Sequence, residues 1–372
     1  MRFSEHFDPQ SIQSSRDHLF NTTPEQVQQL LNKTNLTFQD FLTLISPAAE
    51  SFLEPIAQRS QALTQQRFGK TMTLFMPMYL SNECYNNCSY CGFSYNLEYE
   101  RKTLTDTEIL HEAKKLKEKG MDHVLLLTGE APKTVGVSYI ANAVRLIRPF
   151  FSSIGIEVQP LTTDEYQHLM QAGVDNLAVY QETYHPDAYK TYHLSGKKRR
   201  FTHRLDTMDR AGKAGFYKLN IGALLGLHEW QYEAIALYHH FTHLQQHYWQ
   251  SKLALSIPRI KEMIGDFDVK YPVSDAQLLQ FICAFRLCFP DLSISLSTRE
   301  SEGLRNNLLG LGITDMSAES STNPGGYSGS CSEEQFSISD TRSVTEIAQH
   351  LLDNGYEPVL KNWDSAVIGT PN

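Results

Sequence analysis

Three cysteines dominate the chemistry that this sequence could perform. Cys84, Cys88 and Cys91 form a C-x3-C-x2-C triplet, and Gly92 and Phe93 follow it directly. Thiolates so close together in sequence can bind one metal centre, but three of them leave that centre one ligand short. A structural zinc site needs four protein ligands, whereas a four-iron cluster held by three cysteines keeps one iron open to an outside ligand. The triplet alone is compatible with both kinds of centre.

The composition indicates an ordinary globular protein of a reducing compartment. The chain has 372 residues, of which 41% are hydrophobic and 20% charged, and its net charge of −9 argues against nucleic acid as a partner. The amino terminus lacks an apolar signal core and no run of about eighteen apolar residues occurs, so we expect a cytoplasmic protein outside the membrane. Cys283, Cys288 and Cys331 are scattered, which is not typical of a disulfide framework.

Short apolar runs alternate with amphipathic segments from residue 71 onward, which is typical of βαβ units and a parallel sheet. Eight such units predict a (β/α)8 barrel of the TIM type. An open, doubly wound sheet is the alternative, but no glycine-rich dinucleotide loop follows the first strand. The predicted strands span 73–80, 123–128, 154–160, 176–181, 218–225, 253–258, 293–298 and 313–317. The predicted helices span 106–119, 138–150, 163–172, 204–214, 230–249, 275–288, 302–309 and 344–353.

The same patterns divide the chain into three parts. We expect residues 1–70 to form an N-terminal helical extension and residues 71–340 to form the barrel. Residues 341–372 would supply a last helix and a C-terminal segment that packs on the barrel.

Polar residues gather where the predicted strands end, which in such a barrel is the face that carries reactive groups. The cysteine triplet follows the first strand, and polar residues occupy positions 128–130, 181–183 and 297–300 at the ends of others. Strand ends are also polar simply because they meet solvent, but the triplet at the same rim favours a functional site. The basic run at residues 197–200 is typical of a solvated face, although it could also contact a partner or a cofactor carboxylate.

These motifs resemble the radical S-adenosylmethionine superfamily, whose cysteine loop follows the first barrel strand and carries an aromatic residue, here Tyr90, before its last cysteine. Further segments are similar to its tyrosine lyase, or 2-iminoacetate synthase (ThiH), family of thiamine thiazole synthesis. The resemblance covers nearly the whole chain and implies a 4Fe-4S cluster and S-adenosylmethionine as cofactors. The segments that carry it are residues 79–93, 127–130, 157–161, 180–184, 296–300 and 324–327.

The resemblance implies how the cluster and the amino group of S-adenosylmethionine would be held. The three cysteines of the triplet would ligate the cluster, with Tyr90 packed beside it. Thr128, Gly129 and Glu130 match the superfamily's Gly-Gly-Glu motif, which holds the amino group, with Thr128 in place of the first glycine. Only backbone groups are needed at that first position.

Other residues are candidates for the rest of the same cofactor. Glu157 suits the ribose diol and Arg204 suits the carboxylate, because an acceptor pairs with hydroxyls and a guanidinium with a carboxylate. Arg204 could instead cap or bridge its own helix. Gly222 begins a segment similar to the family's adenine-lining strand, and Gln181 ends the fourth strand beside it.

The resemblance also implies a substrate and partners. Arg299 would clamp an amino-acid carboxylate, with Tyr79 and Ser317 completing the grip. The implied reaction abstracts hydrogen from the amino group of L-tyrosine and cleaves its Cα–Cβ bond to 2-iminoacetate and p-cresol. Reduced flavodoxin or ferredoxin would donate the electron, and thiazole synthase (ThiG) would accept the product. Two alternatives stay open: a lyase of another aromatic amino acid such as tryptophan, and a non-catalytic iron-sulfur or zinc protein.

Overall fold

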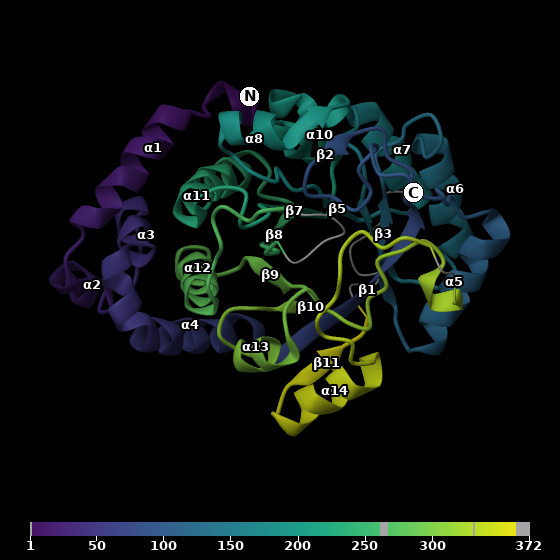
Figure 1. Ribbon diagram of the computed structural model, residues 1–372. Helices are drawn as coiled ribbons and strands as arrows, with labels where there is room; N and C mark the ends of the chain where they lie inside the picture. The colour runs from purple at the N-terminus through teal and green to yellow at the C-terminus, as the bar shows by residue number, and fades with distance from the viewer. Residues whose placement is uncertain (1, 261–266, 330–331, 362–372) are drawn as a thin grey trace.

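Eight parallel strands close into a barrel in the computed structural model, which describes residues 2–260, 267–329 and 332–361 (Figure 1). The strands pair in chain order, and the barrel closes because Thr73 and Phe75 of the first strand pair with Asp315 and Ser317 of the last. The (β/α)8 fold expected from the sequence is therefore confirmed. The barrel strands are β1 (Thr71–Ser81), β3 (His123–Thr128), β4 (Ser153–Glu157), β5 (Asn176–Ala178), β7 (Lys218–Gly222), β8 (Lys252–Ser256), β9 (Ser293–Leu296) and β10 (Asp315–Ser317).

Helices cover the outside of this barrel, and several begin with a strong local signal. Thr105, Thr162, Ser274 and Ser343 each accept a backbone N–H and are paired with a Glu or Gln three residues later, which is the capping box that fixes a helix start. These helices include α5 (Asp106–Glu118), α6 (Val137–Ile147), α7 (Thr163–Ala172), α11 (Trp230–His247), α12 (Asp275–Cys288), α13 (Glu302–Asn307) and α14 (Val344–Asp353).

The barrel strands are buried on both faces, as parallel strands between helices and a barrel interior must be. In β1 the alternate residues Met72, Leu74, Met76 and Met78 have no exposed surface. They belong to one continuous apolar core that also takes in helix residues such as Leu116 of α5. This core holds the carboxyl ends of the strands in fixed relative positions.

Several strands are shorter than the sequence predicted. The strands expected over 176–181 and 218–225 end at Ala178 and Gly222. Beyond these ends, pairing continues only as isolated bridges, one of which joins Glu182 to Ala223. The chain turns there into the loops that build the site.

The connection from β5 to β7 is more elaborate than the single helix predicted over 204–214. That helix is divided at Asp206, and a short strand and two further helical segments precede it. The short strand pairs antiparallel with a two-residue strand inside the cysteine loop. The elements are β2 (Asn87–Cys88), α8 (Pro186–Tyr192), β6 (His193–Ser195), η4 (Lys197–Arg199), α9 (Phe201–Leu205) and α10 (Thr207–Ala214).

The amino-terminal seventy residues are helical and lie outside α11 and α12, where Figure 1 shows them in purple. α4 packs along α12, and Phe41 meets Phe285 edge to face at 5.1 Å between ring centroids. Gln280 of α12 donates to the carbonyl oxygens of Leu44 and Ser46. The elements are η1 (Phe3–Glu5), α1 (Pro9–His18), η2 (Leu19–Asn21), α2 (Pro24–Leu30), α3 (Phe38–Leu44), η3 (Pro47–Phe52) and α4 (Leu53–Phe68).

After β10 the chain crosses the barrel mouth, passes through η5 (Gly326–Ser328), and returns to the opposite end as α14 and β11 (Glu357–Val359). β11 pairs in parallel with the first residues of β1. The crossing segment is anchored by Asp340, which accepts from the fully buried Arg305 at 2.6 Å. The division of the chain at residues 70 and 340 stays a prediction.

None of the helices in the described ranges is both long and apolar enough to cross a membrane. Cys283 and Cys288 lie on α12 as free thiols, and Cys331 lies outside the described residues.

Candidate active site

The cysteine loop leaves β1 at the mouth of the barrel and is fixed on two sides. On one side Tyr85 donates its backbone N–H to the carbonyl oxygen of Glu130 at 3.1 Å, just beyond β3. On the other side β2 pairs with β6, so that Cys88 lies opposite His193. Cys84 and Cys88 are buried and Cys91 is half-buried. The three thiols are therefore held by one short loop that two other connections support.

Gly129 lies where β3 meets this loop, at a position that requires a glycine. A Cβ at this position would lie 2.1 Å from the carbonyl oxygen of Glu83 and 3.1 Å from Cβ of Cys84. The Gly129 amide also donates to the carbonyl oxygen of Ser81 at 3.0 Å. Only a residue without a side chain allows the two backbones to approach so closely.

The three thiols could hold a four-iron cluster, because each cysteine would bind a different iron. Burial raises the pKa of Cys84 to about 11 and also raises the pKa of Cys88 and Cys91. The positive charge of Lys198 acts in the opposite direction on Cys88 and Cys91, as a site for thiolates needs.

A buried ion network connects this loop to the barrel. Arg204 contacts Glu130 at 2.7 Å and Glu182 at 3.4 Å, and Lys198 contacts Glu182 at 2.7 Å. Asn86, inside the cysteine loop, donates its side-chain amide to Glu130 at 2.9 Å. The side chains of the four charged residues are between 7% and 13% exposed. Arg204 thus reaches across the barrel mouth instead of capping its own helix.

The ion network favours the ionised form of its two carboxylates. Burial works against ionisation, yet the charges of Arg204 and Lys198 hold the pKa of Glu130 below its usual value. The pKa of Glu182 is lowered in the same way, against burial, by Lys198 and Arg204. Glu182 also has a φ of 71°, a left-handed conformation that non-glycine residues seldom adopt. Such backbone strain concentrates at functional sites.

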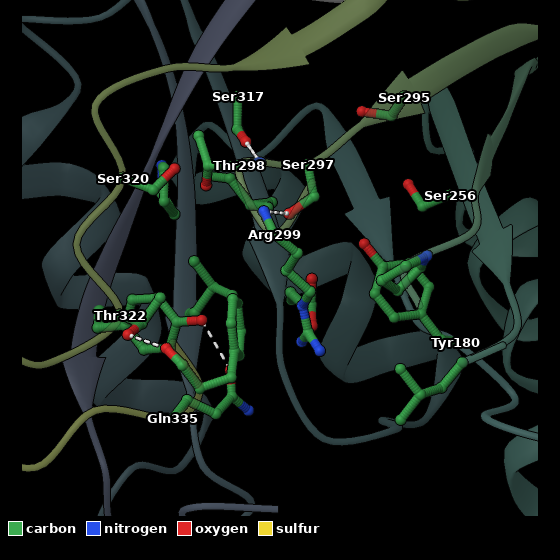
Figure 2. Close-up of a pocket in the computed structure, with 18 of the residues that line it drawn as sticks. Tyr180, Ser256, Ser295, Ser297, Thr298, Arg299, Ser317, Ser320, Thr322 and Gln335 are labelled. Carbon is green, nitrogen blue, oxygen red and sulfur yellow. Dashed lines mark hydrogen bonds between the residues drawn. The ribbon is translucent and has the colours of Figure 1, made fainter. Parts of the chain in front are cut away.

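A cavity lies at the carboxyl ends of the strands, beside the cysteine loop; we call it the mouth cavity (Figure 2). Arg299 extends into it from the end of β9, between Gln335 and Tyr180. The Arg299 guanidinium lies 3.3 Å from the ring centroid of Phe336. Tyr79 donates its hydroxyl to Gln335 at 2.7 Å. The cavity thus combines cationic side chains with aromatic walls.

Ser317 and Tyr90 both line this cavity. The Ser317 hydroxyl accepts the backbone N–H of Thr298 at 3.0 Å, which orders the chain just before Arg299. The hydroxyl of Tyr90 shares a 2.8 Å hydrogen bond with His193, and Lys198 lies 5.7 Å from the ring centroid of Tyr90. Tyr90 therefore connects the cysteine loop to β6 and to the ion network.

Glu157 is one of two carboxylates that line the mouth cavity, the other being Glu182. Burial raises the pKa of Glu157 to about 7, the negative charge of Glu182 adds to the shift, and Arg299 and a hydrogen bond from Tyr180 oppose it. Tyr180 in turn contacts Ser256 through its hydroxyl. Glu157 can therefore be neutral or charged near neutral pH.

The predicted site residues fall into three groups. The mouth cavity brings together Tyr79, Tyr90, Cys91, Glu157, Arg299 and Ser317. A second cavity, the side cavity, lies across the ion network and is lined by Glu130 and Arg204, while Lys198 lines both cavities. Neither cavity is lined by Cys84, Cys88, Thr128, Gly129, Gln181 or Gly222.

Gln181, Thr128 and Gly222, which line neither cavity, lie in close-packed surroundings. The Gln181 amide and the Thr128 hydroxyl are buried and find no hydrogen-bond partner within the described ranges. A Cβ on Gly222 would lie 1.9 Å from the carbonyl oxygen of Ser256 and 3.1 Å from the ring of Tyr180. Gly222 thus lets Tyr180 lie against the barrel, while Leu224 lines the mouth cavity.

Sequence reasoning missed several residues of the site. Glu182 lies in the polar strand end at residues 181–183 and Tyr180 directly precedes it, so the sequence marked this segment without giving either residue a role. Lys198 was hidden in a basic run that is typical of solvated surface. Gln335 and Phe336 gave no signal, because they come from the segment that crosses the mouth after the last strand.

Two family models match this chain. The radical SAM superfamily model matches residues 78–238, and the Biotin and Thiamin Synthesis associated domain matches residues 256–357. The chain is 45% identical to the 2-iminoacetate synthase of Escherichia coli (strain K12) over 345 residues, 92% of both chains. It belongs to the 2-iminoacetate synthase family. The corresponding enzyme of Salmonella typhimurium is 44% identical over 92% of both chains.

Solved structures agree with this assignment to the radical S-adenosylmethionine superfamily, whose members use a 4Fe-4S cluster and S-adenosylmethionine. A crystal structure of HydG, a maturase of the FeFe-hydrogenase, superposes with a TM-score of 0.89 at 28% identity, covering 94% of this chain and 79% of that one. HydG from Carboxydothermus hydrogenoformans superposes with a TM-score of 0.87 at 30% identity, covering 94% of this chain and 83% of that one. Methylornithine synthase (PylB), at 21% identity and a TM-score of 0.72, shares the fold.

The residues present fit the family's cofactors. The cysteine loop offers three thiols and no fourth, the Gly129 approach brings β3 against it, and Lys198 and Arg204 place positive charge beside it. The Gln181 amide, which has no hydrogen-bond partner among the described residues, lies next to the strained Glu182.

The close approach at Gly129 makes a direct prediction for cluster binding. In Gly129→Ala the new Cβ must displace the Glu83 carbonyl, so we expect iron retention under chelator challenge to fall by about 10-fold. Iron and sulfide content after anaerobic reconstitution measures this. Gly303→Ala is the matched control, because a Cβ there meets nothing within 4 Å. Equal retention in both variants would contradict the role of the approach.

The raised pKa of Glu157 makes the stability of the protein depend on pH. The folded protein holds this proton more tightly than the unfolded chain, so the free energy of unfolding falls as pH rises from about 4.5 to about 7. Glu157→Gln removes this titration. From about pH 5 to about pH 8, the free energy of unfolding of Glu157→Gln should rise by about 1–3 kcal/mol relative to that of the unsubstituted protein.

Denaturant midpoints of the cluster-free protein at the two pH values measure this gain. Glu54→Gln, on the exposed face of α4, is the control and should show no relative change. If the denaturant midpoint changed equally with pH in Glu157→Gln and in the unsubstituted protein, Glu157 would ionise normally.

Proposed function

We propose that this protein is a 2-iminoacetate synthase that cleaves the Cα–Cβ bond of L-tyrosine to 2-iminoacetate and p-cresol. 5'-Deoxyadenosine and methionine would be the co-products. The observation that carries the proposal is Arg299, a cation that faces the mouth cavity beside Cys91 in a chain 45% identical to a 2-iminoacetate synthase. When bound, the cluster and S-adenosylmethionine supply the adenosyl radical that this chemistry needs.

Arg299 has the properties of a carboxylate clamp. Burial lowers its pKa, which reports how little water surrounds the charge. Its guanidinium stacks on Phe336, and the described part of the chain offers it no carboxylate at ion-pair distance. A buried cation without a partner is costly, and a bidentate substrate carboxylate would remove that cost.

Tyr79 and Ser317 complete the substrate subsite in this proposal. Burial raises the pKa of Tyr79 well above its usual value, so its phenol stays protonated and cannot serve as a base. The Tyr79 hydroxyl is oriented by Gln335, and the Ser317 hydroxyl by the Thr298 amide. Both act by position, which decides the product when a radical abstracts the nearest hydrogen.

The ion network would hold S-adenosylmethionine beside the cysteines. Glu130, kept ionised by Arg204 and Lys198, suits the amino group. Lys198 and Arg204 suit the carboxylate, and Glu157 in the mouth cavity suits the ribose hydroxyls. Thr128, Gly129, Gln181 and Gly222 would contribute backbone and shape rather than cavity-facing side chains.

The partners follow from the chemistry. One electron is required for each cleavage of S-adenosylmethionine, and reduced flavodoxin or ferredoxin would supply it in the cytoplasm. An imine hydrolyses in water, so transfer of 2-iminoacetate to thiazole synthase is the sensible fate of the product. A lyase of tryptophan keeps the same carboxylate clamp and is the alternative within this chemistry.

Product analysis tests the function. The anaerobically reconstituted protein with dithionite, S-adenosylmethionine and L-tyrosine should form p-cresol and 5'-deoxyadenosine in equal amounts. If tryptophan gave an indole product and tyrosine gave no p-cresol, the substrate would be tryptophan and not tyrosine. Failure to form 5'-deoxyadenosine with either amino acid would refute the radical activity.

Arg299→Gln separates substrate binding from cluster assembly. Loss of the guanidinium should raise the KM for tyrosine by roughly 100-fold, because a buried, charge-assisted contact is lost. The absorption spectrum of the cluster should stay unchanged. Arg145→Gln, at an exposed position of α6, is the control for loss of one positive charge. Loss of the cluster in Arg299→Gln would make Arg299 a structural residue.

A further inference from the structure

The surface outside the cysteine loop is unusually apolar for this chain. Tyr85, Tyr95 and Leu194 are 37%, 65% and 51% exposed. They are three of the seven large apolar side chains that the described residues expose. All three belong to the cysteine loop or to its partner strand: Tyr95 donates its N–H to the carbonyl of Asn86, and Leu194 lies in β6. Exposed apolar side chains gathered in this way mark interaction surfaces.

Positive charge surrounds the same surface. Lys197, Arg199 and Arg200 are exposed on and after η4, and Lys133 is exposed beside Thr134. None of these four cations has an ion-pair partner within the described ranges. The whole chain carries a net charge of −9, so this gathering is a local exception to its overall charge.

Direct contacts attach these cations to the cysteine loop. The Lys198 backbone N–H, within η4, donates to the side chain of Asn86 at 2.9 Å. On the other side, the Tyr85 hydroxyl shares a 2.9 Å hydrogen bond with Thr134, next to Lys133. Gly196, with a φ of 90°, lets the chain turn against Tyr85, because a Cβ there would lie 2.7 Å from the Tyr85 carbonyl oxygen. Lys133 and the basic run therefore flank Tyr85, directly outside Cys84 and Cys88.

The charge and location of this surface suit one kind of occupant. The reaction consumes one electron, which a carrier must deliver to the cluster, and this surface lies on the loop that carries Cys84 and Cys88 and on its partner strand. An acidic carrier would be steered to this surface by the unpaired cations, against the repulsion of a chain that is negative overall. The exposed apolar side chains would then exclude water from the contact.

We propose that the surface formed by Lys133, Lys197, Arg199 and Arg200 around Tyr85 and Leu194 is the docking site for an acidic one-electron carrier protein, which delivers one electron to the cluster and leaves oxidised by one electron. This inference rests on the proposed function, since it requires a cluster that is reduced. It adds the surface and the charge of the partner.

A charge-reversal variant tests the docking site. Lys133→Glu with Arg199→Glu changes two exposed cations that line neither the mouth cavity nor the side cavity. Lys114→Glu with Lys213→Glu makes the same change in net charge at exposed positions of α5 and α10 and is the matched control. Each protein is reconstituted and mixed anaerobically with a reduced flavodoxin, and cluster bleaching is followed. The dissociation constant for oxidised flavodoxin is measured separately by calorimetry.

The docking variant should bind flavodoxin about 10-fold more weakly than the control. At limiting flavodoxin its cluster should be reduced correspondingly more slowly, and the rate of reduction should depend less on salt concentration. Its p-cresol formation with dithionite should match that of the control. Unchanged flavodoxin binding would overturn the assignment. Reduced capture of the imine by thiazole synthase, with flavodoxin binding intact, would also overturn it and assign the surface to that enzyme. Flavodoxin binding and cluster bleaching need no tyrosine, so failure of the proposed activity is recognised separately, by absent p-cresol in the unsubstituted protein.

Discussion

The buried ion network of Glu130, Arg204, Glu182 and Lys198 is the interaction on which the rest of the site depends. It joins the end of β3, the end of β5 and the η4–α9 connection at one point beside the cysteine loop. Because each charge is nearly buried, removal of one partner would leave another uncompensated, so the four side chains hold each other in place. Asn86 extends the network into the loop itself.

This arrangement separates the tasks of the site. The cysteine loop, held by β3 and β6, presents three thiols, and the ion network beside it is suited to a zwitterionic amino-acid group. The mouth cavity on the other side contains the Arg299 guanidinium among aromatic walls, and the described part of the chain places no carboxylate at ion-pair distance from it. Radical chemistry needs orientation more than acid-base strength, and a fixed clamp provides it. The segment carrying Gln335 lines the cavity and contacts both Tyr79 and the cysteine loop.

Local sequence predicted the parts of this site that depend on neighbouring residues. The cysteine spacing could be read from the sequence itself. The glycine after β3 and the arginine after β9 were singled out by the family resemblance, and each follows a strand whose apolar run is clear. Lys198 could not, because its inward direction depends on the pairing of β2 with β6 and on the contact with Asn86, far away in sequence. The strands expected over 176–181 and 218–225 end early because functional loops replace regular pairing at their carboxyl ends. The eight-unit repeat, in contrast, predicted the barrel directly.

The central claim is that three cysteines leave one iron open and that S-adenosylmethionine binds there. Electron paramagnetic resonance of the reduced cluster, with S-adenosylmethionine isotopically labelled in its amino and carboxylate groups, tests it most directly. The account predicts a changed signal and hyperfine coupling to both labelled groups. An unchanged signal without coupling, in protein that holds a full cluster, would contradict it.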